Sequence, residues 1–148
     1  MLSLDHFNKR VMDAGCGTAI LSILASKLGA QHVEAFDIDE WSVENGNENA
    51  QVNQCTNIHI QQGKINEVEL AGTFDIILAN INKNVLLDEL SIYASYLNPG
   101  AKLLLSGFLT FDTDDLLTYA KHYNLIEVSR DERETWAALL LTSAPASV

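Results

Sequence analysis

The feature that most constrains this chain is a glycine turn between a strand-like run and a segment with helical spacing. The run ends in the acid Asp13, and Gly15 and Gly17 follow it closely. A second strand-like run, 32–37, ends in another acid, Asp37, 24 positions after Asp13. At the carboxyl ends of neighbouring parallel strands, glycines let a ligand approach the backbone, and an acid accepts hydrogen bonds from ribose hydroxyls. The pattern therefore predicts a nucleoside-binding crevice at the edge of an open α/β sheet.

The chain alternates strand-like and helical patterns over most of its length. Apolar or alternating runs predict strands over residues 10–13, 32–37, 58–62, 74–79 and 103–105. Apolar residues spaced three and four apart predict helices over residues 18–28, 40–52 and 112–123, and a further helix that carries Leu86, Leu90, Tyr93 and Leu97. We expect Gly29 to end the first helix and Asp39 to cap the second. Asn98-Pro99-Gly100 has the composition of a turn, and the fifth strand is expected to end at Ser106-Gly107.

The C-terminal part of the chain breaks this alternation. Two strand-like runs, 125–128 and 136–142, bracket the charged stretch 130–134 with no helical pattern between them. This arrangement predicts an antiparallel hairpin that closes the sheet, followed by a frayed tail over 143–148. The expected fold is α/β: a three-layer α/β/α sandwich with a mostly parallel sheet and a C-terminal antiparallel hairpin.

Length, charge and cysteine content limit the possible functions. The 148 residues suit a single domain. The net charge of −11 opposes binding to phosphate backbones, so we expect no direct contact with nucleic acid. Two cysteines, no secretory signal and no apolar run of about 20 residues predict a reduced, cytoplasmic chain that does not cross a membrane. No metal site is expected, because the histidines form no ligand cluster in sequence: His6, His32, His59 and His122.

The glycine turn favours a cationic cofactor over a dinucleotide. A dinucleotide fingerprint would have a third glycine at position 20, where this chain has Ile20. Asp13, just before the turn, would repel a pyrophosphate. S-adenosylmethionine carries an ammonium and a sulfonium group and has no phosphate, and it therefore fits the turn better. The C-terminal hairpin also separates this chain from most dehydrogenase domains.

Further stretches extend the pattern of the glycine turn along nearly the whole chain. They include Leu-Ala-Asn-Ile and Ser-Gly-Phe, and they cover residues 11–18, 20–30, 36–41, 74–81, 97–108 and 134–139. The chain resembles class I S-adenosylmethionine-dependent methyltransferases with a Rossmann-like fold. In particular, it is similar to the catalytic domain of the PrmA family, which methylates the stalk-base protein numbered eleven of the large ribosomal subunit. The resemblance implies a basic ribosomal protein as partner, methylated on lysine side chains and its N-terminal amine.

The resemblance also implies a role for each residue of the candidate site. The methionine end of S-adenosylmethionine would lie against the glycine turn, with Asp13, Gly15, Cys16 and Gly17. Asp37 would hold the ribose hydroxyls, Ile38 would pack against adenine, and the turn carrying Lys64 would flank the adenine edge. Asn80 would face the methyl group and the incoming amine as the catalytic residue.

The chain departs from the family pattern in two ways. Ala19 stands where such families usually carry a third glycine, which would cost about 1–2 kcal/mol if the site needs a positive φ. The Ala19 methyl group would also crowd the ligand. In addition, the resemblance covers only the catalytic domain, so we expect a truncated single domain over 1–148. The family's N-terminal substrate-recognition domain and its Gly-, His- and Thr-rich segment are not matched.

Several of these residues also have an ordinary structural interpretation. Asn80 is a possible cap for the following helix, Asp13 a strand-end residue bonded to turn amides, and Asp37 part of an Asx-turn. Cys16 fits a small turn filler better than a nucleophile, since no partner base is in view. Trp41 and Trp136 are expected to be packing residues, although Trp41 lies close enough to the predicted crevice to shield adenine.

Alternative functions remain open on the sequence alone. One is a methyltransferase for RNA or a small molecule, which Ile81 after Asn80 mildly disfavours because base and glutamine methylators have a proline pair there. Another is a cofactor-binding remnant without turnover. A third is a module that binds a nicotinamide dinucleotide.

Overall fold

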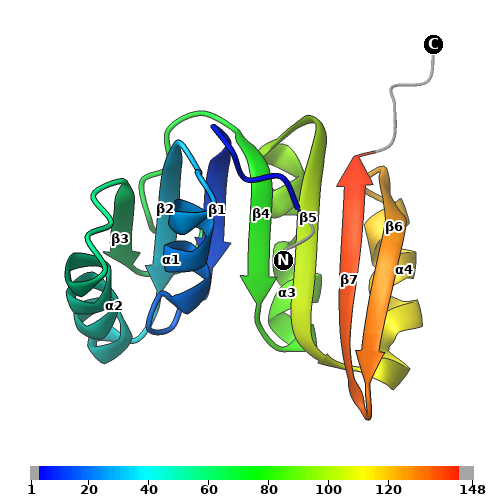
Figure 1. The fold of residues 1–148 in the computed structure, drawn as a ribbon. Coiled ribbons are helices and arrows are strands. Elements are labelled where there is room, and N and C mark those ends of the chain that lie inside the picture. Colours follow the sequence, from blue (N-terminus) through cyan, green and yellow to red (C-terminus); the bar gives the residue numbers. More distant parts are fainter. Residues whose placement is uncertain (1–3, 144–148) are drawn as a thin grey trace.

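Within the part of the chain that the structure describes, seven strands form a single sheet, as the alternation of patterns predicts. The computed structural model describes residues 4–143, and its strand order is β3-β2-β1-β4-β5-β7-β6 (Figure 1). The strands are β1 (Arg10–Ala14), β2 (His32–Asp37), β3 (Ile58–Gln62), β4 (Phe74–Asn80), β5 (Leu97–Leu109), β6 (Leu125–Arg133) and β7 (Trp136–Ser143). All neighbouring pairs up to β5 are parallel, and β7 pairs antiparallel with both β5 and β6. The mostly parallel sheet with its closing hairpin is therefore confirmed.

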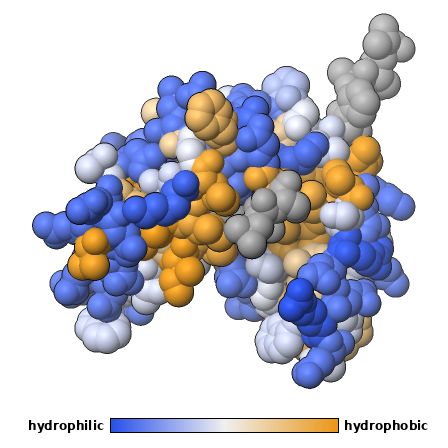
Figure 2. All heavy atoms as spheres, in the orientation of Figure 1, coloured by the Kyte–Doolittle hydropathy of each residue, from blue (hydrophilic) through white to orange (hydrophobic). Residues whose placement is uncertain are grey.

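Helices cover both faces of the sheet. In Figure 1, the first two lie in front of the strands and the last two behind them. The helices are α1 (Ile20–Lys27), α2 (Glu40–Val52), α3 (Lys83–Ser95) and α4 (Thr113–Lys121), with a short 3-10 turn η1 (Thr110–Asp112) before α4. No helix within residues 4–143 is long and apolar enough to cross a membrane. Hydrophilic residues cover α2 and the tip of the β6–β7 hairpin on the face shown in Figure 2.

The core has one part on each side of the sheet. Behind the sheet, α3 and α4 pack on alternating residues of the inner strands, including Leu103, Leu105, Leu139 and Leu141, all fully buried. In front, Ala25 of α1 packs on Val11 and Val33. Because both faces of β1 and β4 are covered, most residues of these strands are apolar and buried, as expected for central parallel strands.

Capping residues place the helices close to their predicted limits. Asp39 accepts the Trp41 backbone N–H and caps α2, and Gly29 follows α1 with a φ of +98°. Both predictions are confirmed. The third helix begins at Lys83, and the Asn82 side chain caps it by accepting the Val85 backbone N–H at 3.1 Å.

The fifth strand is much longer than predicted. The expected turn at Asn98–Gly100 is wrong, because these residues lie within β5. The register on β4 shifts between Phe74, paired with Leu97, and Ile76, paired with Lys102, so the intervening residues of β5 form a bulge. The expected end at Ser106-Gly107 is also wrong, because β5 bulges there and continues to pair with β7.

The C-terminal hairpin includes residues that the sequence assigned to a loop and a tail. The charged stretch 130–134 does not form a long loop, because β6 continues to Arg133 and the chain reverses at Glu134 and Thr135. Ser143, expected in the frayed tail, ends β7, and its hydroxyl accepts the Gly100 backbone N–H at 3.2 Å. The rest of that tail, 144–148, lies outside the described residues.

Candidate functional site

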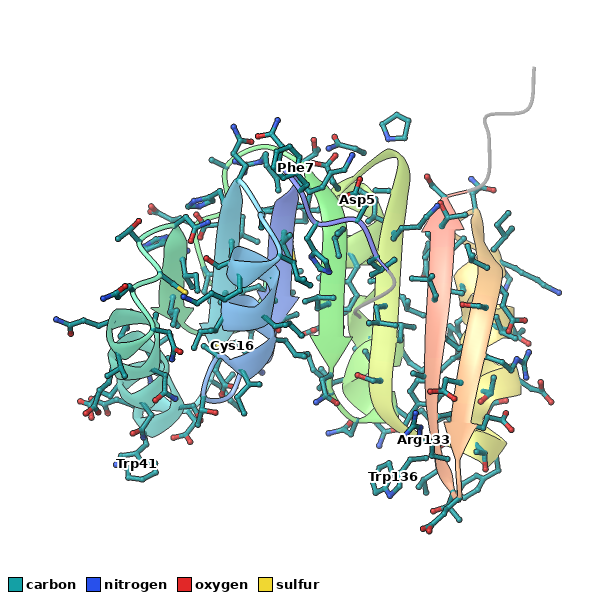
Figure 3. All side chains as sticks on the ribbon, viewed as in Figure 1. Asp5, Phe7, Cys16, Trp41, Arg133 and Trp136 are labelled. Atoms are coloured by element: carbon teal, nitrogen blue, oxygen red, sulfur yellow. The ribbon has the colours of Figure 1, made fainter. Side chains whose placement is uncertain are left out.

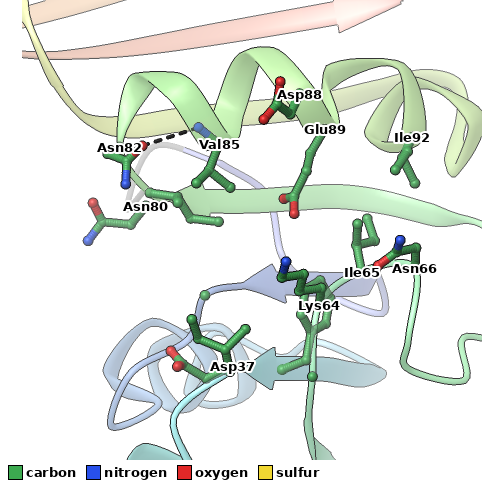
Figure 4. A pocket seen from close by; sticks show the side chains of 15 residues that line it. Asp37, Lys64, Ile65, Asn66, Asn80, Asn82, Val85, Asp88, Glu89 and Ile92 are labelled. Carbon is green, nitrogen blue, oxygen red and sulfur yellow. Dashed lines mark hydrogen bonds between the residues drawn. The ribbon is translucent and has the colours of Figure 1, made fainter.

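A cavity of about 510 Å³ opens where β1, β2 and β4 reach their carboxyl ends (Figure 4). One wall consists of strand ends and turns, and the opposite wall consists of the start of α3. Ligand sites in open α/β sheets occupy this position, and the volume suits a small organic ligand. The lining residues are Gly15, Phe36, Asp37, Ile38, Gly63, Lys64, Ile65, Asn66, Asn80, Ile81, Asn82, Val85, Asp88, Glu89 and Ile92.

The glycine turn borders the cavity at Gly15. Gly15 lines it with a φ of +67°, a conformation that costs glycine little. A Cβ at Gly15 would lie only 2.8 Å from Cγ1 of Ile81, so β1 and the end of β4 approach each other closely here. The Cys16 backbone N–H donates to the Phe36 carbonyl at 3.0 Å and joins the turn to β2. The turn is therefore held on both sides by neighbouring strands.

Asp37 connects the glycine turn to the next helix. Its Oδ2 accepts the Gly17 backbone N–H at 2.9 Å, and its Oδ1 accepts the Asp39 backbone N–H at 2.9 Å. The second bond is the Asx-turn considered from the sequence, yet Asp37 also lines the cavity. Each carboxylate oxygen can accept more than one hydrogen bond, so both roles are compatible.

Asp13 lies beneath the turn and outside the cavity. Its side chain is buried, and its Oδ2 accepts the Ser22 hydroxyl of α1 at 2.6 Å. Burial raises the pKa of Asp13 from 3.8 to about 6, against the lowering effect of the hydrogen bonds from Ser22. Among the described residues no cation pairs with Asp13 within 4.0 Å, so its carboxylate carries an unbalanced negative charge directly below the turn at neutral pH. The predicted contact between Asp13 and a ligand stays a prediction.

Cys16 and Gly17 are also absent from the cavity lining. Burial, followed by the charges of Asp13 and Asp37, raises the pKa of the Cys16 thiol to about 12. The thiol therefore stays protonated, in agreement with a turn filler rather than a nucleophile. Gly17 has a φ of +55°, and nothing lies within 4 Å of the position of a Cβ there.

Ala19 adopts the strained conformation that the sequence suggested. Its φ is +69°, in the left-handed region that disfavours an L side chain. The expected crowding of the ligand is wrong, because Ala19 is fully buried and does not line the cavity. Its methyl group packs toward α2, 3.3 Å from where a Cβ on Gly46 would lie. The absence of a side chain at Gly46 makes room for it.

Asn80 ends β4 at the mouth of the cavity. It is exposed, and the cap of the following helix is Asn82, which removes the capping explanation for Asn80. Gly107, at the bulge of β5, packs against it so closely that a Cβ there would lie 2.7 Å from Asn80 Oδ1. The bulge therefore helps to position Asn80. Its predicted catalytic role stays a prediction.

Ile38 and Lys64 lie on the strand side of the cavity, as predicted. Ile38 is 66% exposed, unusual for an isoleucine and suited to packing against a flat ligand. The Gly63 backbone N–H donates to the Asp37 carbonyl at 2.9 Å, and Glu67 Oε1 accepts the Lys64 backbone N–H at 2.9 Å. The turn that carries Lys64 is therefore fixed beside the end of β2.

The sequence patterns did not predict the α3 wall, which is the face of α3 that lines the cavity. Four of its residues line the cavity at spacings of three, one and three, which is one face of a helix: Val85, Asp88, Glu89 and Ile92. That periodicity was available, but on its own it indicates only an amphipathic helix. With Asp37, Asp88, Glu89 and Lys64 in the lining, the cavity carries three acids and one base, which suits a cation and opposes a pyrophosphate.

The two tryptophans do not pack in the interior. Figure 3 shows Trp41 and Trp136 pointing outward on opposite sides of the molecule, at the edge where the parallel strands end. They are 71% and 57% exposed, so the packing prediction is wrong for both. Neither residue lines the cavity.

Comparison with known proteins identifies the family of this chain. The sequence model of the PrmA family, described as "Ribosomal protein L11 methyltransferase (PrmA)", matches residues 2–144. A protein of that name from Porphyromonas gingivalis is 45% identical over 142 residues, which cover 96% of this chain and 49% of the relative. One from Bacteroides thetaiotaomicron is 41% identical, covering 96% and 51%. The chain thus spans about half the length of the curated relatives it matches.

Solved structures show the same fold. The ribosomal protein L11 methylase of Lactobacillus delbrueckii subsp. bulgaricus superposes with a TM-score of 0.87 at 29% identity, covering 93% of this chain and 70% of that chain. A methyltransferase from Pyrococcus furiosus superposes with a TM-score of 0.81 at 21% identity, covering 95% and 77%. The family match, the identities and the position of the cavity show together that this chain belongs to the PrmA family of ribosomal protein L11 methyltransferases.

Proposed function

We propose that this chain binds S-adenosylmethionine in the cavity and transfers its methyl group to amino groups of a protein. The observation that carries the proposal is the position of Asp37. Its carboxylate lines the cavity and is tied to the glycine turn through the Gly17 N–H. Asp37, an acid of the type that binds ribose, therefore lies beside a turn whose backbone a ligand can approach closely. This arrangement supports the binding of a nucleoside cofactor.

The chemistry of the lining fits this cofactor. S-adenosylmethionine is cationic and has no phosphate, and the cavity carries more carboxylates than amines. When bound, it supplies an activated methyl group on a good leaving group. The residues of this chain then bind and orient the cofactor. Gly15 leaves room for the ligand, Asp37 accepts hydrogen bonds from the ribose hydroxyls, and Ile38 packs against adenine. Asn80 offers its amide oxygen to an incoming amine N–H and so aligns the nucleophile.

Ribosomal protein L11 is the proposed methyl acceptor. Relatives at 41–45% identity carry the name of the L11 methyltransferase. The net charge of −11 complements a basic ribosomal protein and favours its approach. We infer that lysine side chains and the N-terminal amine are the acceptor groups.

Calorimetric titration with S-adenosylmethionine and S-adenosylhomocysteine tests the binding step. We expect both ligands to bind. Asp37→Asn should lower the affinity for S-adenosylhomocysteine about 10- to 100-fold, since hydrogen bonds to a charged group are lost. Asp39→Asn is the matched control, because Asp39 lies two residues away, does not line the cavity, and asparagine also caps helices. Absence of binding at millimolar ligand would overturn the proposal.

Transfer is tested separately with purified L11. The chain and labelled S-adenosylmethionine are incubated with purified L11 and, in parallel, with a cell extract that contains L11, RNA and small molecules, and mass spectrometry locates the methyl groups. Methylated lysines or a methylated N-terminus on L11 are expected. Label on RNA or on small molecules instead of L11 would contradict the proposed acceptor, and binding without label on any acceptor would contradict transfer by this chain.

A further inference from the structure

One asparagine of α2 bonds to the glycine turn rather than to its own helix. Four asparagines in and just after α2 donate a side-chain hydrogen bond to a backbone carbonyl. Three of them donate to the residue four positions earlier, as is possible in any helix: Asn45, Asn47 and Asn53. The fourth, Asn49, donates instead to the Thr18 carbonyl at 3.0 Å. Asn49 has no role in the proposed function so far.

The Thr18 carbonyl depends on this bond because it lies just before the hydrogen-bond ladder of α1. Within residues 4–143, no backbone N–H donates to it, whereas the Ala19 carbonyl accepts the Ile23 N–H at 2.9 Å. At the other end of the same peptide unit, the Ala19 N–H donates to the Cys16 carbonyl at 2.9 Å. The peptide unit between Thr18 and Ala19 is therefore held at both ends, by Asn49 and by the turn itself.

Backbone strain at Ala19 favours reversal of this peptide unit. Ala19 has a φ of +69°, in the left-handed region that disfavours an L side chain. Because a peptide unit is rigid, turning it over by about 180° between its two Cα atoms would bring the φ of Ala19 to about −110°. That change relieves the strain, but it breaks the bonds from Asn49 to Thr18 and from Ala19 to Cys16. A glycine at position 19 would not be strained.

Reversal of the peptide unit would disturb the part of the turn that orients Asp37. The bond from the Ala19 N–H to the Cys16 carbonyl closes the turn over residues 16–19. Within that turn, the Gly17 N–H donates to Asp37 Oδ2 at 2.9 Å, and Asp37 lines the cavity. A turn that opens at Ala19 would therefore release this carboxylate from its position at the cavity.

We propose that Asn49 is a positioning residue for the cofactor site. It holds the Thr18 carbonyl, prevents reversal of the strained peptide unit, and so compensates for the alanine at position 19. Asn49 itself does not line the cavity, so it acts through the turn and not by contact with the ligand. The effect on cofactor affinity rests on the proposed binding of S-adenosylmethionine.

Calorimetric titration with S-adenosylhomocysteine tests the effect on affinity. Asn49→Ala should lower the affinity about 3- to 10-fold, as expected when one hydrogen bond no longer favours the binding-competent turn. Asn45→Ala is the matched control, because Asn45 lies one helical turn earlier and its amide bonds only to Trp41 of the same helix. It should leave the affinity unchanged. Asn49→Ala combined with Ala19→Gly should return to within about 2-fold of the native affinity, because glycine removes the strain. A general weakening of α2 would not be reversed in this way.

Amide hydrogen exchange without ligand tests the peptide unit directly. The Ala19 N–H should exchange faster in Asn49→Ala than in Asn45→Ala, because reversal removes it from the Cys16 carbonyl. Asn49→Asp is a second variant of nearly the same size. Its carboxylate only accepts hydrogen bonds, so it should also speed this exchange and weaken binding.

Two results would overturn the inference. One is equal exchange of the Ala19 N–H in Asn49→Ala and Asn45→Ala. The other is a loss of affinity in Asn49→Ala that Ala19→Gly does not restore. If the native chain binds no S-adenosylhomocysteine, the proposed function fails, and the exchange at Ala19 alone decides whether Asn49 holds the turn.

Discussion

The two walls of the cavity differ in what forms them. The strand wall consists of strand ends and turns, and the α3 wall is the face of α3 that lines the cavity. The strand wall depends on backbone conformation, with Gly15 at positive φ and Asp37 bonded to two backbone amides. The α3 wall consists of side chains that project from one face of a regular helix. A change in the strand wall should therefore disturb folding and binding together. A change in the α3 wall should alter the choice of ligand while the fold survives.

The largest expected effect is in the strand wall, at Gly15. Gly15→Ala would place a Cβ 2.8 Å from the Ile81 side chain at a φ of +67°. Strain and overpacking together should lower the free energy of unfolding by about 3–4 kcal/mol, measured by urea denaturation. Gly17→Ala is the control, because its φ is also positive but its Cβ would meet nothing within 4 Å. We expect it to lose only about 1–2 kcal/mol, and equal losses would contradict the role of packing.

The next effect concerns the buried charge beneath that wall. The raised pKa of Asp13, about 6 against 3.8, means that the native state holds this proton more tightly than the unfolded state. Asp13 therefore costs stability increasingly from pH 4 to 6 and fully above that. Asp13→Asn should raise the free energy of unfolding by about 1–3 kcal/mol at pH 7.5 and by much less near pH 4. Urea denaturation at both pH values measures this gain, and a gain independent of pH would contradict it.

A smaller effect is expected at the start of the α3 wall. Asn82→Ala removes the cap on the Val85 N–H and should cost about 1 kcal/mol of unfolding free energy by urea denaturation. Lys83 also anchors this end of α3, with ion pairs to Asp115 at 2.7 Å and Asp112 at 3.2 Å, so the helix should persist. Asn84→Ala, at the second residue of the same helix and without a capping bond, should change stability by less than about 0.5 kcal/mol. A loss at Asn82 no larger than the loss at Asn84 would show that the cap is unimportant.

The smallest effect should occur at Ala19. Ala19→Gly relieves about 1–2 kcal/mol of backbone strain but removes a buried methyl group worth about 0.8 kcal/mol. The net change should be a gain of about 0–1 kcal/mol in thermal or urea unfolding, with affinity for S-adenosylhomocysteine unchanged because Ala19 does not line the cavity. A large gain in affinity would show that the methyl group does crowd the ligand.

The strand wall was largely predictable from sequence, and the α3 wall was not. Gly15, Asp37, Ile38, Lys64 and Asn80 follow strand ends, and parallel strands bring their carboxyl ends to the same edge of a sheet. Position along the chain is therefore enough to place them. The face that α3 turns toward the cavity depends on how the helix packs across β4 and β5, which no local pattern specifies.

The sequence by itself determined the alternation of strands and helices, the C-terminal hairpin and the glycine turn beside the acid Asp37. These features follow from local periodicity and from backbone conformations that few residues adopt. Only the tertiary structure decided that Asp13 is buried beneath the turn, that Ala19 points toward Gly46, and that Glu89 faces Lys64 across the cavity. Each of these depends on the neighbours that distant segments supply, because burial and side-chain direction are properties of the packed molecule.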